Sequence, residues 1–173
     1  MSDIAVMAVA ETTPAISVNT PCAPQDVEAF LEVADRVASK RGQRMTKIRR
    51  KVLRLLLTSE GPAKAYDLLA HLDGDGAAKP PTIYRALDFL QSLGLAHKIE
   101  SLNAYVACGH ASHAHSAVFL ICEVCGQAEE LHSTATTAAL RSETEGAGFR
   151  LSRAMIEARG LCRDCVAAQA AGG

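Results

Sequence analysis

Cysteine and histidine are concentrated between residues 108 and 125. These eighteen residues hold three of the six cysteines and three of the six histidines in the 173-residue chain. Thiolate and imidazole are borderline-soft donors, and Zn²⁺ is the common metal ion that accepts both. The composition of this stretch therefore indicates metal binding.

Two Cys-x-x-Cys pairs form the clearest motif. The first is Cys122 with Cys125, and the second, after 36 intervening residues, is Cys162 with Cys165. A two-residue gap lets both sulfurs of a pair turn toward one ion, and Gly126 permits the positive φ that such a turn often needs. The spacing predicts a closed, tetrahedral structural zinc site with four thiolate ligands.

A second set of donors surrounds the first pair. Its candidates are His97, Cys108, His110, His113, His115, Glu129 and Glu130. Three histidines within six residues, next to a cysteine outside the pairs, favour a further ligand cluster, although spacing does not decide which histidine or glutamate takes part. His97 and Cys108 belong to a different part of the chain from the glutamates. A metal held by both groups would bridge two domains.

Composition sets the broad class of the protein. Hydrophobic residues make up 49% of the chain and charged residues 21%, which predicts a packed core, and no apolar run is long enough to span a membrane. No Lys or Arg precedes Arg36, so a secretory signal with a basic n-region is not expected. We therefore expect a cytoplasmic protein, in which paired cysteines bind metal more often than they form disulfides.

Charge is strongly segregated although the net charge is only −1. Residues 1–35 carry six acids and no base, residues 36–104 carry thirteen bases and six acids, and nine of the eighteen bases lie from Arg36 to Arg54 without an intervening acid. A basic block of this kind is the electrostatic pattern of a nucleic-acid contact surface.

The apolar periodicity predicts a winged helix-turn-helix in the first half of the chain. Helical spacing is present over residues 26–39, 47–58, 63–72 and 80–93, and Thr46 is placed to cap the second helix. On that helix we expect Ile48, Val52, Leu55 and Leu56 to be buried. Two β-prone runs, 95–99 and 104–107, then predict a hairpin of the size called a wing. The fourth helix would be the recognition helix, with Tyr84 and Arg85 facing outward.

The second half predicts a small α/β domain. Strands are expected at 117–121, 127–131 and 149–158, in an antiparallel sheet, with a helix at about 133–145 capped by Ser133. A core of this size usually requires a staple, a metal or a partner subunit. The low-complexity residues 1–24, which include Cys22, predict a mobile tail.

Six segments carry a recognisable family pattern: Ala65–Leu69, Lys79–Leu90, His97–Ser101, Ile121–Gly126, Ile156–Ala158 and Gly160–Cys162. In these segments the chain resembles the ferric uptake regulator family, and most closely its zinc uptake regulator branch. The resemblance covers residues 27 to about 168. It implies a winged-helix DNA-binding domain over residues 26–107 and an α/β dimerisation domain over 108–168, between tails at 1–25 and 169–173.

The resemblance also selects functional residues. It implies regulatory zinc ligands at His97, Cys108, His115 and Glu130, and so two zinc ions per chain. It places DNA contacts at Tyr66, Thr82, Tyr84 and Arg85, and the basic block adds Lys47, Arg50 and Lys51 as candidates for phosphate contact. The family commonly opens its second helix with Thr-Pro-Gln-Arg, whereas this chain has Thr46-Lys47-Ile48-Arg49, so local contacts there can differ.

The leading hypothesis is a zinc-responsive repressor of zinc homeostasis genes that binds operator DNA as a homodimer, with no membrane and no small-molecule substrate other than zinc. The nearest alternative is an iron- or peroxide-responsive regulator on the same fold, which the soft Cys108 thiolate disfavours. An enzyme is not expected. A thiol oxidoreductase lacks a thioredoxin-like βαβ context here, and a zinc hydrolase needs an open coordination position and a general base.

Overall fold

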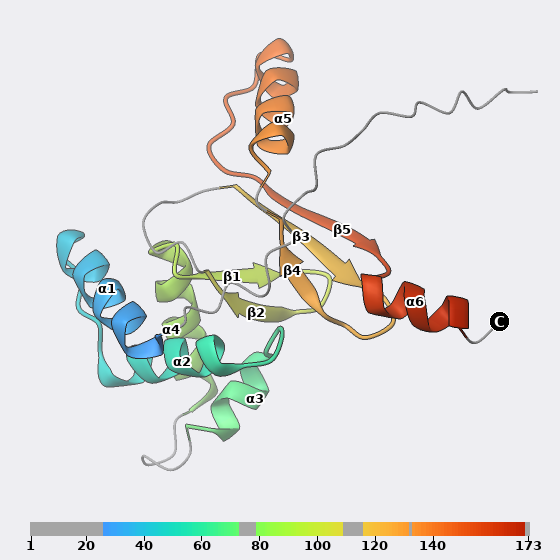
Figure 1. Cartoon of the computed structure of the whole chain (residues 1–173). Helices are drawn as coiled ribbons and strands as arrows, with labels where there is room; N and C mark the ends of the chain where they lie inside the picture. Colours follow the sequence, from blue (N-terminus) through green and yellow to red (C-terminus); the bar gives the residue numbers. More distant parts are fainter. Residues whose placement is uncertain (1–25, 73–78, 109–115, 132, 172–173) are drawn as a thin grey trace, which may run out of the picture.

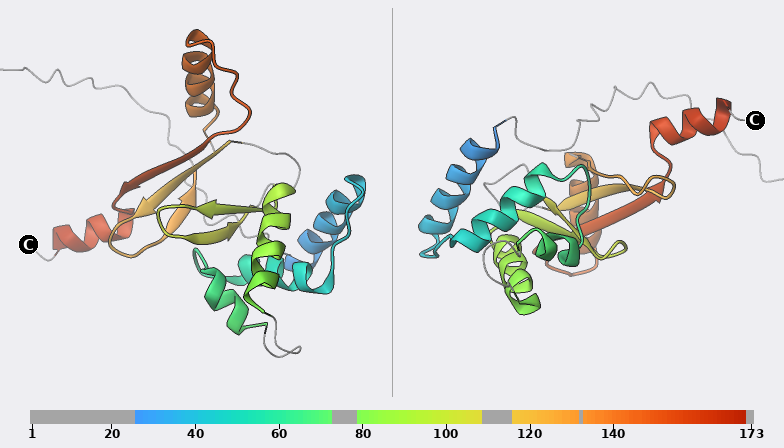
Figure 2. Two further views of the ribbon diagram at one scale, coloured as in Figure 1. Left: turned by 180° about the vertical axis from the view of Figure 1, so that it is seen from behind. Right: turned by 90° about the horizontal axis from the view of Figure 1, so that it is seen from below.

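The computed structural model describes residues 26–72, 79–108, 116–131 and 133–171. The predicted tail at 1–25, the glycine-rich turn at 73–76 and the histidines His110, His113 and His115 lie outside these ranges. Four helices and a hairpin form the N-terminal half, and a small sheet with two helices forms the C-terminal half (Figure 1). The hairpin lies between the helices and the sheet in each view (Figure 2).

The first two helices begin at side-chain caps. α1 (Val27–Lys40) begins after Asp26, whose carboxylate accepts hydrogen bonds from the N–H groups of residues 28 and 29 at 2.9 and 3.1 Å. α2 (Lys47–Thr58) begins after Thr46, whose hydroxyl accepts from the N–H of Arg49 at 3.4 Å. The predicted threonine cap is confirmed, and it works without the proline that is common in the family because the cap needs only the hydroxyl.

The next two helices complete the helical half. α3 (Ala65–Ala70) is short, and α4 (Pro80–Ser92) starts with two prolines. Proline suits the first turn of a helix because its fixed φ is already helical and its missing N–H would have no intrahelical acceptor. The predicted apolar stripe of α4 is buried throughout and consists of Ile83, Ala86, Leu87, Leu90 and Leu93.

The prediction for the buried face of α2 is partly wrong. Val52 and Leu56 are buried as expected, but Leu53 and Leu57 complete the face, while Ile48 is 40% exposed. Leu55 packs only at the margin of the core. The periodicity is helical as predicted, but the face is rotated, because α2 must meet both α1 and α4.

The predicted wing is present as an antiparallel hairpin. β1 (Ala96–Ile99) pairs with β2 (Ala104–Ala107), with His97 opposite Val106. The hairpin belongs to two cores. Its helix-proximal residues, including Tyr105, pack in the helical core, whereas Ile99 packs with side chains of the C-terminal sheet. The wing therefore joins the two halves of the molecule.

The C-terminal sheet is mixed, which corrects the predicted antiparallel arrangement. Its strand order is β4-β3-β5. β3 (Ala117–Cys122) pairs antiparallel with β4 (Ala128–Glu130) but parallel with β5 (Met155–Gly160). The register of the parallel pair runs from Ala117 opposite Met155 to Cys122 opposite Gly160.

The cysteines explain why β5 must be parallel to β3. A parallel β5 ends beside Cys122 and delivers Cys162 directly to the first cysteine pair. An antiparallel β5 would end beside Ala117, five residues away along β3, or about 17 Å at the usual rise of a strand. One four-cysteine site therefore requires the parallel pairing.

In the C-terminal half the first helix agrees with the prediction, whereas the third strand and the last helix do not. α5 (Thr134–Gly146) follows its predicted cap, because the Ser133 hydroxyl accepts from the Thr136 N–H at 3.1 Å. The third strand begins at residue 155, not 149, and Phe149 lies before it with 60% of its surface exposed. α6 (Arg163–Ala171) was not predicted, and it continues past residue 168 where we expected the domain to end.

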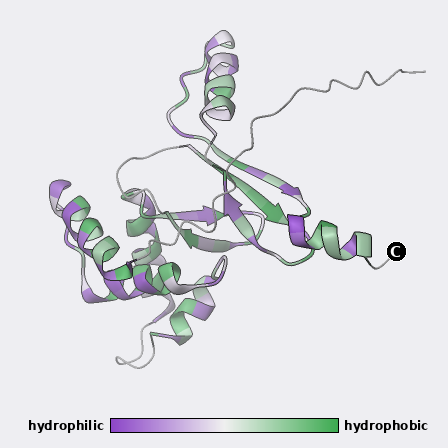
Figure 3. Cartoon of the chain, viewed as in Figure 1, coloured by the Kyte–Doolittle hydropathy of each residue, from purple (hydrophilic) through white to green (hydrophobic). Residues whose placement is uncertain are grey.

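Within the C-terminal half, the buried apolar residues lie in the sheet and not in the helices. β3 is hydrophobic along its length, whereas α5 and α6 contain no buried residue (Figure 3). α5 stands away from the sheet (Figure 1). Among the described residues, no helix is both long enough and apolar enough to cross a membrane.

The helical core gives the first testable prediction. Leu87 is fully buried on α4, so Leu87→Ala should lower the free energy of unfolding by about 2–5 kcal/mol through lost transfer free energy and a cavity. Ile48→Ala, at the exposed position of α2, should cost less than about 1 kcal/mol. Denaturant titration at one fixed protein concentration measures both. Equal losses would show that the burial of the two sites is wrongly assigned.

Candidate metal centres and nucleic-acid interface

The two Cys-x-x-Cys pairs meet at the end of β3. One sulfur from each of Cys122, Cys125, Cys162 and Cys165 lies within 4.8 Å of all the others. Cys122 is the last residue of β3 and Cys125 lies in the turn that follows, with Gly126 at φ 73° as expected. Cys162 directly precedes α6, and Cys165 lies in its first turn. The sulfurs of Cys125 and Cys162 are 3.8 Å apart.

That separation fits a tetrahedral metal site. Two thiolates bound to one zinc ion at about 2.3 Å with tetrahedral angles lie about 3.8 Å from each other. A disulfide would bring the sulfurs to about 2.05 Å. Four soft donors grouped at this distance fit a structural zinc ion and leave no open coordination position for a substrate.

Backbone groups prepare one thiol of the set to be a thiolate. Backbone hydrogen bonds, first from Cys125 and next from Cys162, lower the pKa of Cys122 to about 6. The N–H of Cys162 lies 3.4 Å from the Cys122 sulfur. The opposite holds at Cys165, where the side chain of Cys162 is the main cause that raises the pKa to about 12. Thiolates this close repel each other, and a bound cation offsets that repulsion.

A second group of metal donors lies where the wing meets the sheet. One ligand atom from each of His97, Cys108 and Glu130 lies within 4.8 Å of the others. His97 is on β1, and Cys108 follows β2 and donates its N–H to Leu95 at 3.0 Å. Because the hairpin is antiparallel, it returns Cys108 to the end at which His97 lies.

The third donor comes from the other half of the molecule. Glu130 is on β4 opposite Phe119 of β3, and the His97 ring meets Phe119 edge to face at 5.6 Å between centroids. Successive strand residues face opposite sides, so Glu129 lies on the other side of the sheet, along the hollow beside the four cysteines. The strand geometry therefore brings Glu130, rather than Glu129, to His97 and Cys108.

The donor set and its burial suit a zinc ion. His97 is 6% exposed and Cys108 is fully buried. One imidazole, one thiolate and one carboxylate are typical zinc ligands, and the two negative charges balance a dication in a site with little water. The fourth donor implied by the resemblance, His115, lies outside the described residues.

The exposed side of α3 and α4 carries the predicted DNA-contact residues. Tyr84 and Arg85 are exposed near the start of α4, with half-buried Thr82 one turn earlier. Tyr66 is 80% exposed on α3, which packs against α4. Exposed tyrosine and arginine side chains can hydrogen-bond and stack on a ligand, which the buried face of α4 cannot do.

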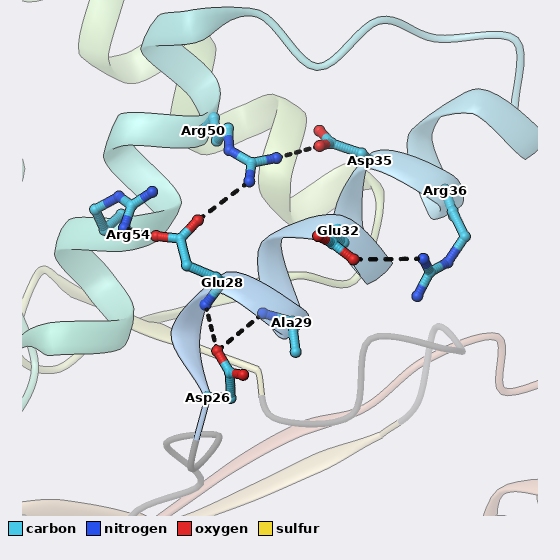
Figure 4. Close-up of polar contacts among 8 residues, drawn as sticks. All are labelled: Asp26, Glu28, Ala29, Glu32, Asp35, Arg36, Arg50 and Arg54. Atoms are coloured by element: carbon cyan, nitrogen blue, oxygen red, sulfur yellow. Dashed lines mark hydrogen bonds and ion pairs between the residues drawn. The ribbon is translucent and has the colours of Figure 1, made fainter.

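Much of the basic block is paired with other groups of the protein, which changes the interpretation made from charge. Arg50 forms ion pairs with Asp35 and Glu28, and Arg54 pairs with Glu28 (Figure 4). The hydrogen bond to Arg54 is the main cause that lowers the pKa of Glu28. These contacts join α1 to α2, so the acids of residues 1–35 neutralise part of the block.

Two further arginines of the block also bind within the protein. The Arg49 guanidinium lies 3.5 Å from the centroid of the Phe89 ring, and Arg41 donates to the Ser92 carbonyl at 2.7 Å. Both contacts attach the α1–α2 region to α4. Of the three candidates for phosphate contact, Lys47 is exposed, Lys51 is half-buried, and Arg50 is directed to α1.

One polar contact between the two halves was missed from the sequence. Glu157 on β5 accepts hydrogen bonds from the backbone N–H groups of Glu100 and Ser101 in the wing turn, at 2.7 and 3.1 Å. Both segments are among the family-like stretches, which was the available signal. No local pattern, however, connects residues 56 positions apart.

Comparison with known proteins agrees with these geometries. The sequence pattern of the ferric uptake regulator family matches residues 40–159. The chain is 39% identical to the Zinc uptake regulation protein of Escherichia coli (strain K12) over 145 residues, which covers 83% of this chain and 85% of that protein. This chain belongs to the ferric uptake regulator family.

Two solved structures of family members resemble the whole described architecture. A structure of a zinc uptake regulator complexed with zinc and DNA has a TM-score of 0.78 and 38% identity, covering 85% of this chain and 99% of that one. The structure of holo XcZur has a TM-score of 0.73 and 44% identity, covering 80% and 98%. Both likenesses therefore extend over most of this chain.

The four-cysteine group gives the second prediction. Cys162→Ser should lower the tightly bound zinc of the purified protein by about one ion per chain and lower its melting temperature, because a small sheet loses the ion that joins β3 to α6. Metal analysis and thermal denaturation measure the two effects. Cys22→Ser removes a thiol outside the described residues and is the matched control. Unchanged zinc content in Cys162→Ser would refute the site.

Proposed function

We propose that this protein is a zinc-responsive, DNA-binding transcriptional repressor that acts as a homodimer on genes of zinc homeostasis. The observation that carries the proposal is the meeting of His97, Cys108 and Glu130 at the junction of the wing and the sheet. These donors come from both halves of the molecule. Their occupancy is therefore coupled to the orientation of the helical half.

The donor chemistry favours zinc over iron as the signal. Zinc accepts mixed sulfur, nitrogen and oxygen ligands in a tetrahedral site without penalty, whereas ferrous iron prefers more and harder ligands. Cys108 is buried within this site, so it contributes a soft ligand that an iron- or peroxide-responsive regulator would not require. We propose His115 as the fourth ligand, which gives two zinc ions per chain with the four-cysteine site.

The response to zinc follows from thermodynamic linkage. When bound, zinc would supply charge that holds the imidazole, the thiolate and the carboxylate together. The side chains on the wing and on β4 then favour one orientation of the helical half over others, so the population shifts toward the arrangement that fits DNA. Coupling is reciprocal, and operator DNA must tighten zinc binding by the same factor.

We assign DNA recognition to the exposed surface of α3 and α4. Helix N-terminal residues of a winged helix reach base edges in the major groove, which suits Tyr84 and Arg85. Thr82 is in the same first turns of α4, and Tyr66 is exposed on α3, which packs against α4. Lys47 contacts phosphate, whereas the ion pairs of Arg50 make it a structural residue of the α1–α2 interface.

Exposed apolar side chains support a homodimer. Val124, Phe149, Met155, Leu161 and Val166 are each at least 40% exposed, and all lie in the C-terminal half. Exposed apolar side chains on a small domain are costly in water and are commonly covered by a partner. A second copy would place two recognition helices on one operator, as dimeric regulators require.

The zinc response gives the third prediction. Cys108→Ser should keep the protein folded and its four-cysteine site loaded, yet raise the zinc concentration needed for half-maximal operator retention at least tenfold, because a hydroxyl is a much poorer ligand than a thiolate. Gel retention at constant salt across a zinc series measures this. Glu130→Gln should behave similarly, whereas Glu129→Gln should stay near wild type.

The outcomes separate the site from the function. A wild-type protein whose operator binding ignores zinc refutes the proposed function. A zinc-responsive wild type with an unchanged midpoint in Cys108→Ser shows that the regulatory ligands are wrongly assigned. Equal effects of Glu129→Gln and Glu130→Gln would contradict the assignment of Glu130 to the side of β4 that faces His97 and Cys108.

DNA recognition gives the fourth prediction. Arg85→Ala should cost about 1–3 kcal/mol on operator DNA and relax specificity at one position, because it loses a base contact. Lys47→Ala should weaken binding to operator and random DNA alike and lower the salt slope by about 1. Arg50→Ala removes the same charge from the same helix but should leave that slope nearly unchanged.

Binding isotherms on both DNAs across a salt series distinguish these cases. Equal and sequence-independent losses for Arg85→Ala and Lys47→Ala would show that α4 reads no base. A salt slope that falls by about 1 in Arg50→Ala would show that its ion pairs with α1 open on DNA.

A further inference from the structure

The carboxylate of Glu157 closes the wing turn, residues 100–103, onto the C-terminal sheet. One of its oxygens accepts from the Glu100 N–H at 2.7 Å and the other accepts from the Ser101 N–H at 3.1 Å. Each oxygen thus has its own donor. A carboxylate bound by two backbone N–H groups forms charge-assisted hydrogen bonds, which are stronger than those between neutral groups.

The place of Glu157 in the sheet makes this contact an extension of the apolar junction. Glu157 lies opposite Phe119 in the parallel pairing of β5 with β3, so both side chains are on the same face of the sheet. On that face Phe119 packs with Ile99, and Leu102 of the wing turn packs at the margin of the same cluster. The polar contact therefore lies next to buried apolar contacts and is partly shielded from water.

The wing is thereby attached to the sheet at both ends. At the open end of the hairpin, His97 and Cys108 meet Glu130. At the closed end, the wing turn meets Glu157. Three or four residues of strand, or about 10 Å, separate the two attachments. A short hairpin held at one end can swing about that point, whereas attachments at both ends fix its position and its direction.

We propose that Glu157 is a positioning residue of the zinc switch, which holds the wing turn so that metal binding at the other end of the hairpin selects the DNA-binding orientation of the helical half. The inference rests on the proposed function. The relative placement of the two halves supports it, because the chain resembles, over 85% of its length, a zinc uptake regulator complexed with zinc and DNA with a TM-score of 0.78. The hydrogen bonds add part of the free energy that favours this arrangement, so less must come from the metal.

The state of the carboxylate agrees with this role. Partial burial raises the pKa of Glu157, but hydrogen bonds from the Ser101 side chain and from the backbone of Glu100 and Ser101 outweigh it, and the pKa is lowered. The group is therefore a carboxylate, with both oxygens able to accept, at neutral pH.

The test is Glu157→Gln, which keeps the size of the side chain but leaves one acceptor oxygen for two N–H donors. Glu143→Gln removes the same charge from an exposed position on α5 and is the matched control. The first measurement is amide hydrogen exchange of Glu100 and Ser101 in the full-length zinc-loaded protein. We expect at least a tenfold faster exchange at these two amides in Glu157→Gln, with unchanged exchange along α4.

The second measurement is operator retention across a zinc series, with zinc content at the four-cysteine site as a check on folding. The zinc midpoint should rise about tenfold in Glu157→Gln, while maximal retention at saturating zinc stays at the wild-type level, because enough zinc still fills the DNA-binding arrangement. Glu143→Gln should match the wild type in both measurements.

Each result decides whether the contact of Glu157 with the wing turn has a positioning role. A zinc-responsive wild type whose midpoint equals that of Glu157→Gln refutes the positioning role. A lower midpoint in the variant also refutes it, because the contact would then hold an inactive orientation. A wild type that ignores zinc refutes the proposed function and, with it, any role of this contact in DNA binding, whatever the amide exchange shows.

Discussion

β3 is apolar on both faces, and the wing covers one of them. Side chains alternate along a strand, so Ala117, Phe119 and Ile121 face one way and must be buried there. No helix of the C-terminal half supplies that cover, since α5 and α6 have no buried residue. The wing covers it instead, through Ile99 and its neighbours. The hydrophobic effect thus draws the DNA-binding half onto the sheet.

Two consequences follow from a wing that belongs to both halves. The ends of the hairpin come close to polar groups of the sheet, so ligands from separate halves can meet at one end and a carboxylate can hold the turn at the other. Packing alone gives an approximate orientation, because apolar contact is not directional. Directional bonds at the hairpin ends select one orientation, and this is where a metal signal can act on a distant helix.

Acidic and basic segments of the chain are paired with each other in the helical half. Acids of α1 bind arginines of α2, and another arginine stacks on Phe89 of α4. Exposed ion pairs contribute little stability individually, but here they form a connected group between helices. The basic surface that remains for other contacts is therefore smaller than the basic block implies.

Local signals in the sequence were sufficient for α1 to α5, the cap at Thr46, the wing and the two cysteine pairs, because each depends on neighbours within a few residues. The resemblance to the family selected Glu130, which β4 faces toward His97. Tertiary structure alone decided which arginines pair with acids of α1, which residues form α6 and that Glu157 meets the wing turn. The parallel pairing of β5 lies between these cases, since a single four-cysteine site implies it. Contacts between residues far apart in sequence depend on how all the elements pack together, and no short window of residues contains that information.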